Sequence, residues 1–299
     1  MTSDPLLRSG RFSAWLLAIR PPTLTAAVVP VIVGTAVAAR AETAQFGAAM
    51  AALFGALLIQ IGTNLVNDVD DFERGADAAG RLGPRRATQA GLLTPHQVRS
   101  AAWLAFGAAA VAGSYLCAQA GWPIVAVGVA SIASGLAYTG GPWPLGYNGL
   151  GDVFVFIFFG LVAVVATYYV QAGSVSGVAV AAALPVGALA TAILVVNNVR
   201  DHETDRVVGK RTLAVRLGER AVRAEYIGLV TLAYAVPAAL WLHGDSAWIL
   251  LPWLTLPWAI RLSRLMTTCR EGPRFNGALR STAQLHAAFG VLFAAGLLA

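Results

Sequence analysis

The stretch VFVFIFFGLVAVVATYYVQAGSVSGVAVAAALPVGALATAILVVNNV, residues 153–199, contains no Asp, Glu, Lys or Arg. An unpaired charge is costly inside a lipid bilayer, and a helix that crosses one needs about 20 consecutive apolar residues. The stretch is long enough for two such helices, and the sequence Gln171-Ala-Gly-Ser174 near its middle favours a turn between them. This segment therefore predicts a pair of membrane-spanning helices.

Further charge-free stretches lie on both sides of this pair. They are residues 21–39, 43–67, 100–151, 226–244, 246–260 and 281–299. The third of these is also long enough for two crossings, with a turn expected near Ala120-Gly-Trp-Pro123. The helix after Asp245 has a short apolar run, and we expect it to extend past Arg261 and Arg264, whose long side chains can snorkel to the interface. The sequence thus predicts an all-α fold, a polytopic membrane bundle of nine transmembrane helices that forms a single domain over residues 1–299.

The composition agrees with this interpretation. Of the 299 residues, 57% are hydrophobic and 12% are charged, whereas a soluble domain carries about a quarter charged residues. These values argue against a soluble enzyme. The net charge of +6 points to membrane topology before nucleic acid. Cys117 and Cys269 lie far apart in mostly apolar surroundings, so the sequence predicts neither a disulfide framework nor a Cys-x-x-Cys metal site.

The arginines gather on one side of the predicted bundle. They precede the first helix and follow the second, sixth and eighth: Arg8, Arg11 and Arg20; Arg74, Arg81, Arg85, Arg86 and Arg99; Arg200 to Arg223; Arg261 to Arg280. The opposite connections hold, as charged or titratable groups, only Arg40, Glu42, His243 and Asp245. Because cytoplasmic loops retain an excess of Lys and Arg, the pattern predicts a cytoplasmic N-terminus and an external C-terminus.

Two short segments hold eight of the 15 acidic residues. The first reads Asn64-Leu-Val-Asn67-Asp68-Val-Asp70-Asp71-Phe-Glu73-Arg74-Gly75-Ala-Asp77, and the second reads Asn197-Asn-Val-Arg200-Asp201-His-Glu203-Thr-Asp205-Arg206-Val-Val-Gly209-Lys210. Each begins with asparagine in an apolar helix end, continues with two spaced aspartates, and reaches a glycine four residues after the second. We expect the first motif to belong to a cytoplasmic loop over residues 68–97 and the second to a cytoplasmic loop over residues 201–222.

Spacings of three and four residues place the asparagine and the two aspartates of each motif on one helical face. Carboxylates held so close together repel one another unless a cation neutralises them, and oxygen ligands suit Mg²⁺, which shares one or two carboxylates with substrate phosphates. The candidate metal ligands are Asn64, Asp68, Asp71, Asp77, Asn197, Asp201 and Asp205, and the four aspartates Asp68, Asp71, Asp201 and Asp205 are the candidate catalytic residues. Asp70, Glu73 and Glu203 fall off the main faces.

Basic residues follow both motifs, and they would contact the oxygens of a diphosphate held between the metal ions. The main candidates are Arg74, Arg81, Arg206 and Lys210, with Arg85, Arg86 and Arg211 nearby in sequence. A metal-bound diphosphate attached to an apolar hydrocarbon chain is typical of an allylic prenyl diphosphate. Its pyrophosphate leaves to give an allylic cation. An apolar bundle would protect that cation from water, and aromatic faces would stabilise it. Candidates for this role are Tyr138, Tyr147, Phe154, Phe158, Tyr168 and Tyr169, although each also fits an interfacial or packing role.

With these motifs, the chain resembles the UbiA-type intramembrane aromatic prenyltransferases, and within them the branch that acts on 1,4-dihydroxy-2-naphthoate. The resemblance covers nearly the whole chain. It is carried by Ala18-Ile-Arg-Pro-Pro-Thr-Leu24, Asn64 to Asp77, Gly83-Pro84 through Gly91, Tyr138-Thr-Gly-Gly-Pro142 through Asp152, Phe158-Phe-Gly160, and Asp201 to Gly218.

The resemblance implies a magnesium-dependent transfer of a polyprenyl group onto the ring carbon of 1,4-dihydroxy-2-naphthoate that bears the carboxylate. Carbon dioxide and pyrophosphate are lost, and demethylmenaquinone is formed. In this reading Asn64, Asp68, Asp71, Asp201 and Asp205 match the metal and diphosphate motifs, and Lys210 matches a basic position after the second motif. The resemblance also implies a bacterial inner membrane location with the active site on the cytoplasmic side.

The acceptor pocket is less tightly defined by the sequence. Arg20, at the cytoplasmic end of the first helix, is a candidate either for binding the naphthoate carboxylate or for anchoring the helix. The candidate pocket for the acceptor and the cation is completed by Asn67, Tyr138, Tyr147 and Tyr168. Prenylation of another aromatic acceptor, such as 4-hydroxybenzoate, stays open because the diphosphate half of the site would be shared. A membrane transporter is a second alternative, although here every acidic cluster lies at one face and not at the bilayer midplane.

Overall fold

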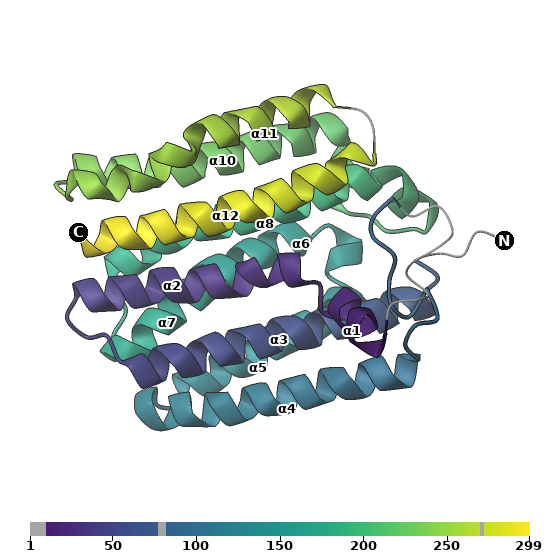
Figure 1. Ribbon diagram of the computed structural model, residues 1–299, viewed down its shortest axis with the longest axis horizontal. Helices are drawn as coiled ribbons and strands as arrows, with labels where there is room; N and C mark the ends of the chain where they lie inside the picture. Colours follow the sequence, from purple (N-terminus) through teal and green to yellow (C-terminus); the bar gives the residue numbers. More distant parts are fainter. Residues whose placement is uncertain (1–9, 77–81, 270–271) are drawn as a thin grey trace.

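The computed structural model describes residues 10–76, 82–269 and 272–299, and every regular element in these ranges is a helix (Figure 1). The longest helices run side by side along one axis, with the C-terminus at one end of the bundle. The elements are α1 (Arg11–Ile19), η2 (Pro21–Leu24), α2 (Thr25–Arg40), α3 (Phe46–Glu73), α4 (Pro95–Ala120), α5 (Pro123–Thr139), η3 (Gly146–Asn148), α6 (Gly151–Val155), η4 (Phe156–Val162), α7 (Ala163–Ala172), α8 (Gly177–Val207), α9 (Leu213–Leu217), α10 (Glu219–Leu242), η5 (Ala247–Thr255), α11 (Leu256–Thr268) and α12 (Arg274–Leu298).

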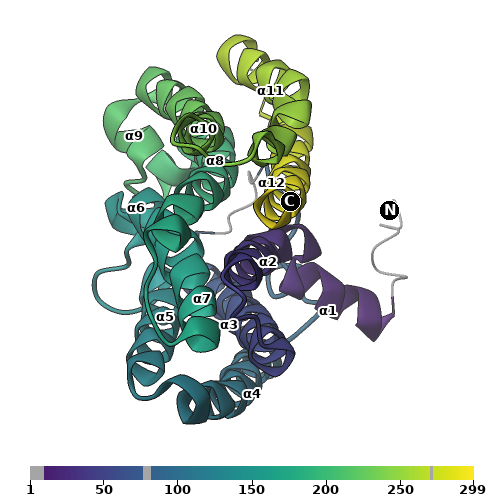
Figure 2. The ribbon, with the colours of Figure 1, turned by 90° about the vertical axis from the view of Figure 1, so that its left-hand side faces the viewer.

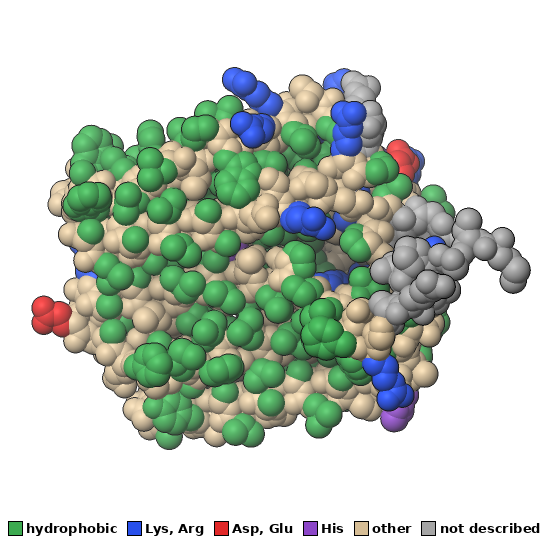
Figure 3. Space-filling view, viewed as in Figure 1, with side chains coloured by type: hydrophobic (Ala, Val, Ile, Leu, Met, Phe, Trp, Pro, Cys, Tyr) green, Lys and Arg blue, Asp and Glu red, His purple; other side chains and the backbone are tan. Residues whose placement is uncertain are grey.

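Seven helices in the described ranges are long and apolar enough to cross a membrane. They are Pro21–Arg40, Phe46–Glu73, Pro95–Ala120, Gly151–Ala172, Gly177–Val207, Glu219–Leu242 and Arg274–Leu298. Large apolar side chains on their outer surfaces, such as Phe46, Leu104 and Val111, are exposed, and apolar side chains are spread over the whole face seen in Figure 3. Because such a surface is stable only against lipid, the chain is a multi-pass membrane protein.

Several predicted boundaries are confirmed. The long stretch 100–151 is divided at Gly121, since α4 ends at Ala120 and α5 begins at Pro123. The stretch 153–199 is divided at Gly173, which has a positive φ of 68°. The helix after Asp245 forms as η5 followed by α11, and α11 continues past Arg261 and Arg264 to Thr268 as expected.

The loop assignment of the two acidic motifs is wrong at its start. Residues 68–73 belong to α3 and residues 201–207 belong to α8, so the motifs are the last turns of long helices and the loops begin after them. The reason is burial: Asp68 and Asp71 are only 1% and 2% exposed, and a buried main chain must keep its hydrogen bonds, which a continuing helix supplies.

The glycine of each motif ends its helix in the same way. Gly75 and Gly209 have positive φ angles of 69° and 76°. The amide of the residue after each glycine donates to the carbonyl oxygen of the motif's last aspartate, Ala76 to Asp71 and Lys210 to Asp205, at 2.9 Å in both. This is the hydrogen-bond pattern of a glycine-terminated helix. Asp71 and Asp205 therefore hold equivalent positions, one turn before a helix end.

The main core lies where α8 packs against α10, α12 and η4, and where α12 packs against α2 (Figure 2). The element η4 is π-helical and runs unusually close to α8. An added Cβ on Gly160 would lie 2.6 Å from Gly187 Cα, so only glycine fits this crossing. A second, smaller core joins α1 and α4 to the part of α3 that carries the first motif. These contacts hold both motifs at the same end of the bundle.

Candidate active site

A cavity of about 660 Å³ opens between α2, α3, α5, η4, α8 and α12, with both acidic motifs at one end. Its polar end is lined by Asp71 and Asn67 from α3 and by Asn197, Asp201 and Asp205 from α8. The other end is lined by apolar or small side chains, among them Ala26, Ala27, Ala56, Ile59, Phe158, Ala163 and Ala190. The cavity is therefore polar at one end and apolar at the other, and it is suited to a molecule with a polar head and an apolar tail.

Asp71 is a buried carboxylate of the first motif with a partner on each of its oxygens. It is 2% exposed, and Arg86 Nη2 donates to its Oδ2 at 2.9 Å while the hydroxyl of Tyr147 donates to its Oδ1 at 2.9 Å. Arg86 also lines the cavity. A buried carboxylate held by a guanidinium and a phenol keeps one orientation, because both of its oxygens have fixed partners.

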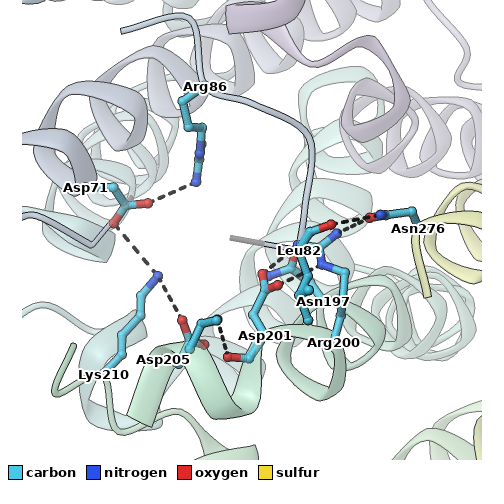
Figure 4. Close-up of polar contacts among 10 residues, drawn as sticks. Asp71, Leu82, Arg86, Asn197, Arg200, Asp201, Asp205, Lys210 and Asn276 are labelled. Atoms are coloured by element: carbon cyan, nitrogen blue, oxygen red, sulfur yellow. Dashed lines mark hydrogen bonds and ion pairs between the residues drawn. The ribbon is translucent and has the colours of Figure 1, made fainter. Parts of the chain in front are cut away.

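Lys210 brings the two motifs together (Figure 4). Its Nζ lies 3.8 Å from Asp71 Oδ1 and 4.0 Å from Asp205 Oδ1, and it stands 4.8 Å from the centre of the Tyr147 ring. The lysine follows the glycine that ends α8, so the turn at Gly209 aims it at the first motif. A cation thus lies between carboxylates of two helices, at the polar end of the cavity.

Asp201 is held by its neighbour in sequence. Arg200 donates to both carboxylate oxygens, from Nε at 2.8 Å and from Nη2 at 2.6 Å, and Nη2 also donates to Asn197 Oδ1 at 2.7 Å. Asp201 and Asn197 line the cavity, whereas Arg200 lies behind them. Each acidic motif therefore carries one buried arginine, Arg86 on the first and Arg200 on the second.

Two asparagines of α3 in the cavity wall, Asn64 and Asn67, bind the surrounding main chain and side chains. Asn64 Nδ2 donates to the carbonyl oxygen of Ile19 at 2.8 Å and to Thr23 Oγ1 at 2.9 Å. These bonds fix the turn that carries Arg20, whose backbone is left-handed with a φ of 57°. Asn67 Oδ1 accepts a 2.6 Å bond from Thr139 Oγ1 at the end of α5. Arg20 and Asn67 both line the cavity.

Some predicted site residues lie away from the cavity wall. Asp68 is buried but does not line the cavity, and Tyr147 lies next to the site, where it contacts Asp71 and Lys210 without lining the cavity. Arg74 donates to the carbonyl oxygen of Gly141 at 2.5 Å, and Arg206 is exposed on the outer side of α8. Tyr168 belongs to the main core. Asp77 and Arg81 lie outside the described residues.

The aromatic wall combines predicted and unexpected residues. Tyr138, Phe154 and Phe158 line the cavity, and the last two rings stack with centroids 5.9 Å apart. Phe159 lines it as well, although sequence reasoning did not select it. The π-helical turn of η4 explains this, because its wider spiral turns two successive phenylalanines toward the same side. The residue pattern of Phe156–Val162 does not distinguish a π-helix from an α-helix.

The donor set at the polar end fits Mg²⁺. No three His, Cys, Asp or Glu side chains in the described part of the chain are grouped closely enough to form a metal cage by themselves. Mg²⁺ does not require such a cage, since it binds one or two carboxylates together with substrate phosphates and water. Asp71, Asp201 and Asp205 supply hard oxygen donors from two facing helices, and the cations Lys210 and Arg86 also line this part of the cavity.

Known proteins are similar to this chain in sequence and in fold. The profile of the UbiA prenyltransferase family matches residues 27–275. The 1,4-dihydroxy-2-naphthoate octaprenyltransferase of Mycobacterium tuberculosis is 39% identical over 271 residues, which cover 91% of this chain and 92% of that protein. The protein of the same name from Bacillus subtilis is 33% identical, covering 93% and 90% of the two chains. A UbiA homolog from Archaeoglobus fulgidus, solved with DMAPP and Mg²⁺ bound, superimposes with a TM-score of 0.68 at 14% identity over 95% of this chain and 98% of that one.

Proposed function

Since the chain belongs to the UbiA prenyltransferase family and is an aromatic prenyltransferase, we propose that it transfers a polyprenyl group from an allylic diphosphate to 1,4-dihydroxy-2-naphthoate. The relatives named for this acceptor match nearly the full length of both chains. The observation that carries the proposal is the cavity itself, which has carboxylates and cations at one end and an apolar, aromatic wall at the other.

The diphosphate is proposed to lie at the polar end, near Lys210 and Arg86. Asp71, Asp201 and Asp205 would hold Mg²⁺ there, and the metal would supply charge that stabilises the leaving pyrophosphate. The binding of DMAPP and Mg²⁺ by the Archaeoglobus fulgidus homolog supports this arrangement. The side chains of this protein contribute fixed cations, so that the charge that develops on the leaving oxygen meets a preorganised site.

The prenyl chain is proposed to lie along the apolar end, between Ala26, Ile59 and Ala163. When the bond between its first carbon and the diphosphate oxygen breaks, pyrophosphate leaves with the electron pair. The resulting allylic cation lies among Tyr138, Phe154 and Phe158, whose ring faces attract positive charge. The same wall keeps water away from the cation.

The acceptor is proposed to bind beside Arg20 and Asn67, between the diphosphate end and the aromatic wall. The ring carbon that bears the carboxylate forms the new carbon–carbon bond, and carbon dioxide leaves without the electron pair of its bond to the ring. That pair restores the aromatic ring, so no base has to remove a proton from this carbon.

We also propose the membrane arrangement predicted from the charges: nine crossings, a cytoplasmic N-terminus, and an active site on the cytoplasmic side of a bacterial inner membrane. Beyond the seven long helices, two helical segments would supply the two remaining crossings, α5 with 17 residues and η5 with α11 over Ala247–Thr268. At the opposite end of the bundle, the exposed charges include Arg40 and Asp245, which form an ion pair with each other. An arrangement of this kind leaves the arginine-rich end toward the cytoplasm.

Product mass tests the proposal. Purified protein in lipid vesicles receives Mg²⁺, geranylgeranyl diphosphate and either 1,4-dihydroxy-2-naphthoate or 4-hydroxybenzoate. The expected product is a prenylated naphthoquinol that has lost its carboxylate. A prenylated hydroxybenzoate that keeps its carboxylate, formed in preference, would overturn the acceptor and retain the diphosphate site. If no product forms with either acceptor, a flux assay on the same vesicles tests the transporter alternative.

A further inference from the structure

Arg200 makes four hydrogen bonds close to the cavity. It is 4% exposed, and its fork holds both oxygens of Asp201, which is 6% exposed. Residues next to each other on a helix do not normally face one another. The arginine side chain must therefore fold back along α8 to reach its neighbour, and this fixes the Asp201 carboxylate in one orientation.

The same guanidinium bonds to α12, and through α12 it is linked to the segment at residue 82 (Figure 4). Its Nη1 donates to Asn276 Oδ1 on α12 at 2.9 Å. Asn276 Nδ2 in turn donates to the carbonyl oxygen of Leu82 at 2.9 Å, in the segment that follows the first acidic motif. One arginine and one asparagine thus join α8, α12 and the residue 82 main chain into a single network.

Gly83 packs directly on this network. A Cβ added to it would lie 2.7 Å from Arg200 Nη2 and 2.9 Å from Arg200 Cζ. The Gly83 main chain therefore closes over the guanidinium, and a larger residue would push the arginine away from Asp201. The pair is enclosed by protein and is not a solvated surface contact.

A buried ion pair contributes to a defined geometry only when its remaining donors are also satisfied. Here the fork places two bonds on Asp201, one on Asn197 and one on Asn276. Asp201 and Asn197 line the cavity, whereas Arg200, Asn276 and Gly83 do not. Any effect of the arginine on a ligand must therefore pass through the residues that it holds.

We propose that Arg200 is a positioning residue that, held by Asn276 and Gly83, sets the Asp201 carboxylate for a divalent cation and its diphosphate. The proposal rests on the proposed function, because it assigns Asp201 to the cation. Partners that orient a metal ligand change metal affinity or activity by about 10- to 100-fold when they are removed. The network also joins α12 and the segment after the first motif to the second motif. A displacement of either one therefore changes the orientation of the Asp201 carboxylate.

The test measures cation affinity directly, apart from turnover. Purified protein in detergent is titrated with Mn²⁺ in the presence of inorganic pyrophosphate, and free Mn²⁺ is followed by electron paramagnetic resonance. Asn276→Ala removes the acceptor of Nη1 and the link to Leu82 while Arg200 keeps its charge, and Arg200→Lys keeps the charge without the fork. Gly83→Ala pushes the guanidinium without changing any polar group.

Arg223→Lys is the matched control. Arg223 is also buried, pairs with Glu219 at 2.8 Å and donates to the carbonyl oxygens of Met266 and Cys269, but it lies outside the cavity wall. Arg200→Lys is expected to weaken Mn²⁺ binding about 10-fold or more, and Asn276→Ala and Gly83→Ala by smaller factors in the same direction. Arg223→Lys should lower thermal stability but leave Mn²⁺ affinity unchanged. In turnover, excess Mg²⁺ should restore the rate of Asn276→Ala.

Wild-type Mn²⁺ affinity in folded Asn276→Ala and Gly83→Ala would overturn the proposal, as would an equal loss in Arg223→Lys. A wild-type protein that binds no Mn²⁺ with pyrophosphate would overturn it as well. If the wild type binds Mn²⁺ and the variants show these losses, yet the wild type forms no prenylated product, the proposed function is refuted and the positioning role of Arg200 stays in place.

Discussion

Lys210 Nζ lies 3.8 Å from Asp71 Oδ1, although the two residues belong to different acidic motifs and to different parts of the bundle. The glycine turns after both motifs have the same geometry, so Asp71 and Asp205 hold equivalent positions in their helices. Lys210 directly follows the second of these turns, and its side chain therefore lies between the two aspartates. One cation therefore serves both motifs, and a diphosphate bound here would contact it from the cavity side.

Replacing Lys210 by alanine is expected to raise the apparent KM for the prenyl diphosphate by about 10- to 100-fold, because a hydrogen bond to a charged group contributes about 1.5–3 kcal/mol. The KM for the aromatic acceptor should change little. Steady-state kinetics with each substrate varied in turn measures both constants. Arg220→Ala, an exposed arginine in the first turn of α10, is the control and should match the wild type. A change confined to the acceptor would contradict the role given to Lys210.

The equivalence of Asp71 and Asp205 leads to a second prediction. Asp71→Asn and Asp205→Asn should each lower turnover by about 100-fold or more, and by similar factors, because each removes a carboxylate proposed to hold the Mg²⁺ that stabilises the leaving pyrophosphate. Rates of product formation at saturating Mg²⁺ provide the comparison, with insertion and folding checked by gel filtration in detergent. Normal turnover in both folded variants would remove the two-motif site from the mechanism.

The sequence predicts the membrane helices well because the cost of burying charge is a local property of a stretch of chain. It also places the two motifs on one side, and their helical spacing anticipates that Asp71, Asp201 and Asp205 face the same cavity. It does not predict which residues lie behind that wall. Arg200 and Asn276 are 76 positions apart, and their contact depends on how α12 packs on α8.

Asn64 illustrates the same limit. Its spacing to Asp68 and Asp71 suits a metal ligand, but in the fold its amide nitrogen donates to the turn that carries Arg20, because η2 packs against α3 at this point. Asn64 and Asp71 of the predicted helical face line the cavity, whereas Asp68 does not. The partners of the Asn64 side chain depend on a neighbouring element that the local sequence does not specify.

That turn yields a third prediction, on the acceptor. Asn64→Leu removes the bonds to Ile19 and Thr23, and Thr23→Val removes the bond from Asn64 and the bond that Thr23 Oγ1 donates to the carbonyl oxygen of Arg20. Arg20 should then lose its fixed place in the cavity wall. We expect the KM for the naphthoate to rise at least about 5-fold in each variant, since each such bond contributes about 1 kcal/mol. Thr25→Val is the control, because the Thr25 hydroxyl binds Pro22 on an exposed surface. If Asn64→Leu instead raised the Mg²⁺ requirement and spared the acceptor, Asn64 would be a metal ligand.

The fourth prediction concerns the crossing of η4 and α8. Gly160→Ala places a methyl group 2.6 Å from Gly187 Cα and 3.0 Å from the carbonyl oxygen of Ala183, so the two helices must separate. Overpacking of this kind costs about 1–3 kcal/mol, and the thermal midpoint in detergent should fall. Turnover should fall too, because η4 carries Phe158 and Phe159 into the cavity.

Gly228→Ala is the control that separates this effect from a general effect of alanine. Gly228 lies in the middle of α10 with no atom within 4 Å of an added Cβ. Alanine should be neutral there or stabilise by about 0.5–1 kcal/mol, because glycine is a poor helix former. Midpoints and rates are measured for both variants under the same conditions. Equal behaviour of the two variants would show that the close approach of η4 to α8 neither stabilises the fold nor places the phenylalanines.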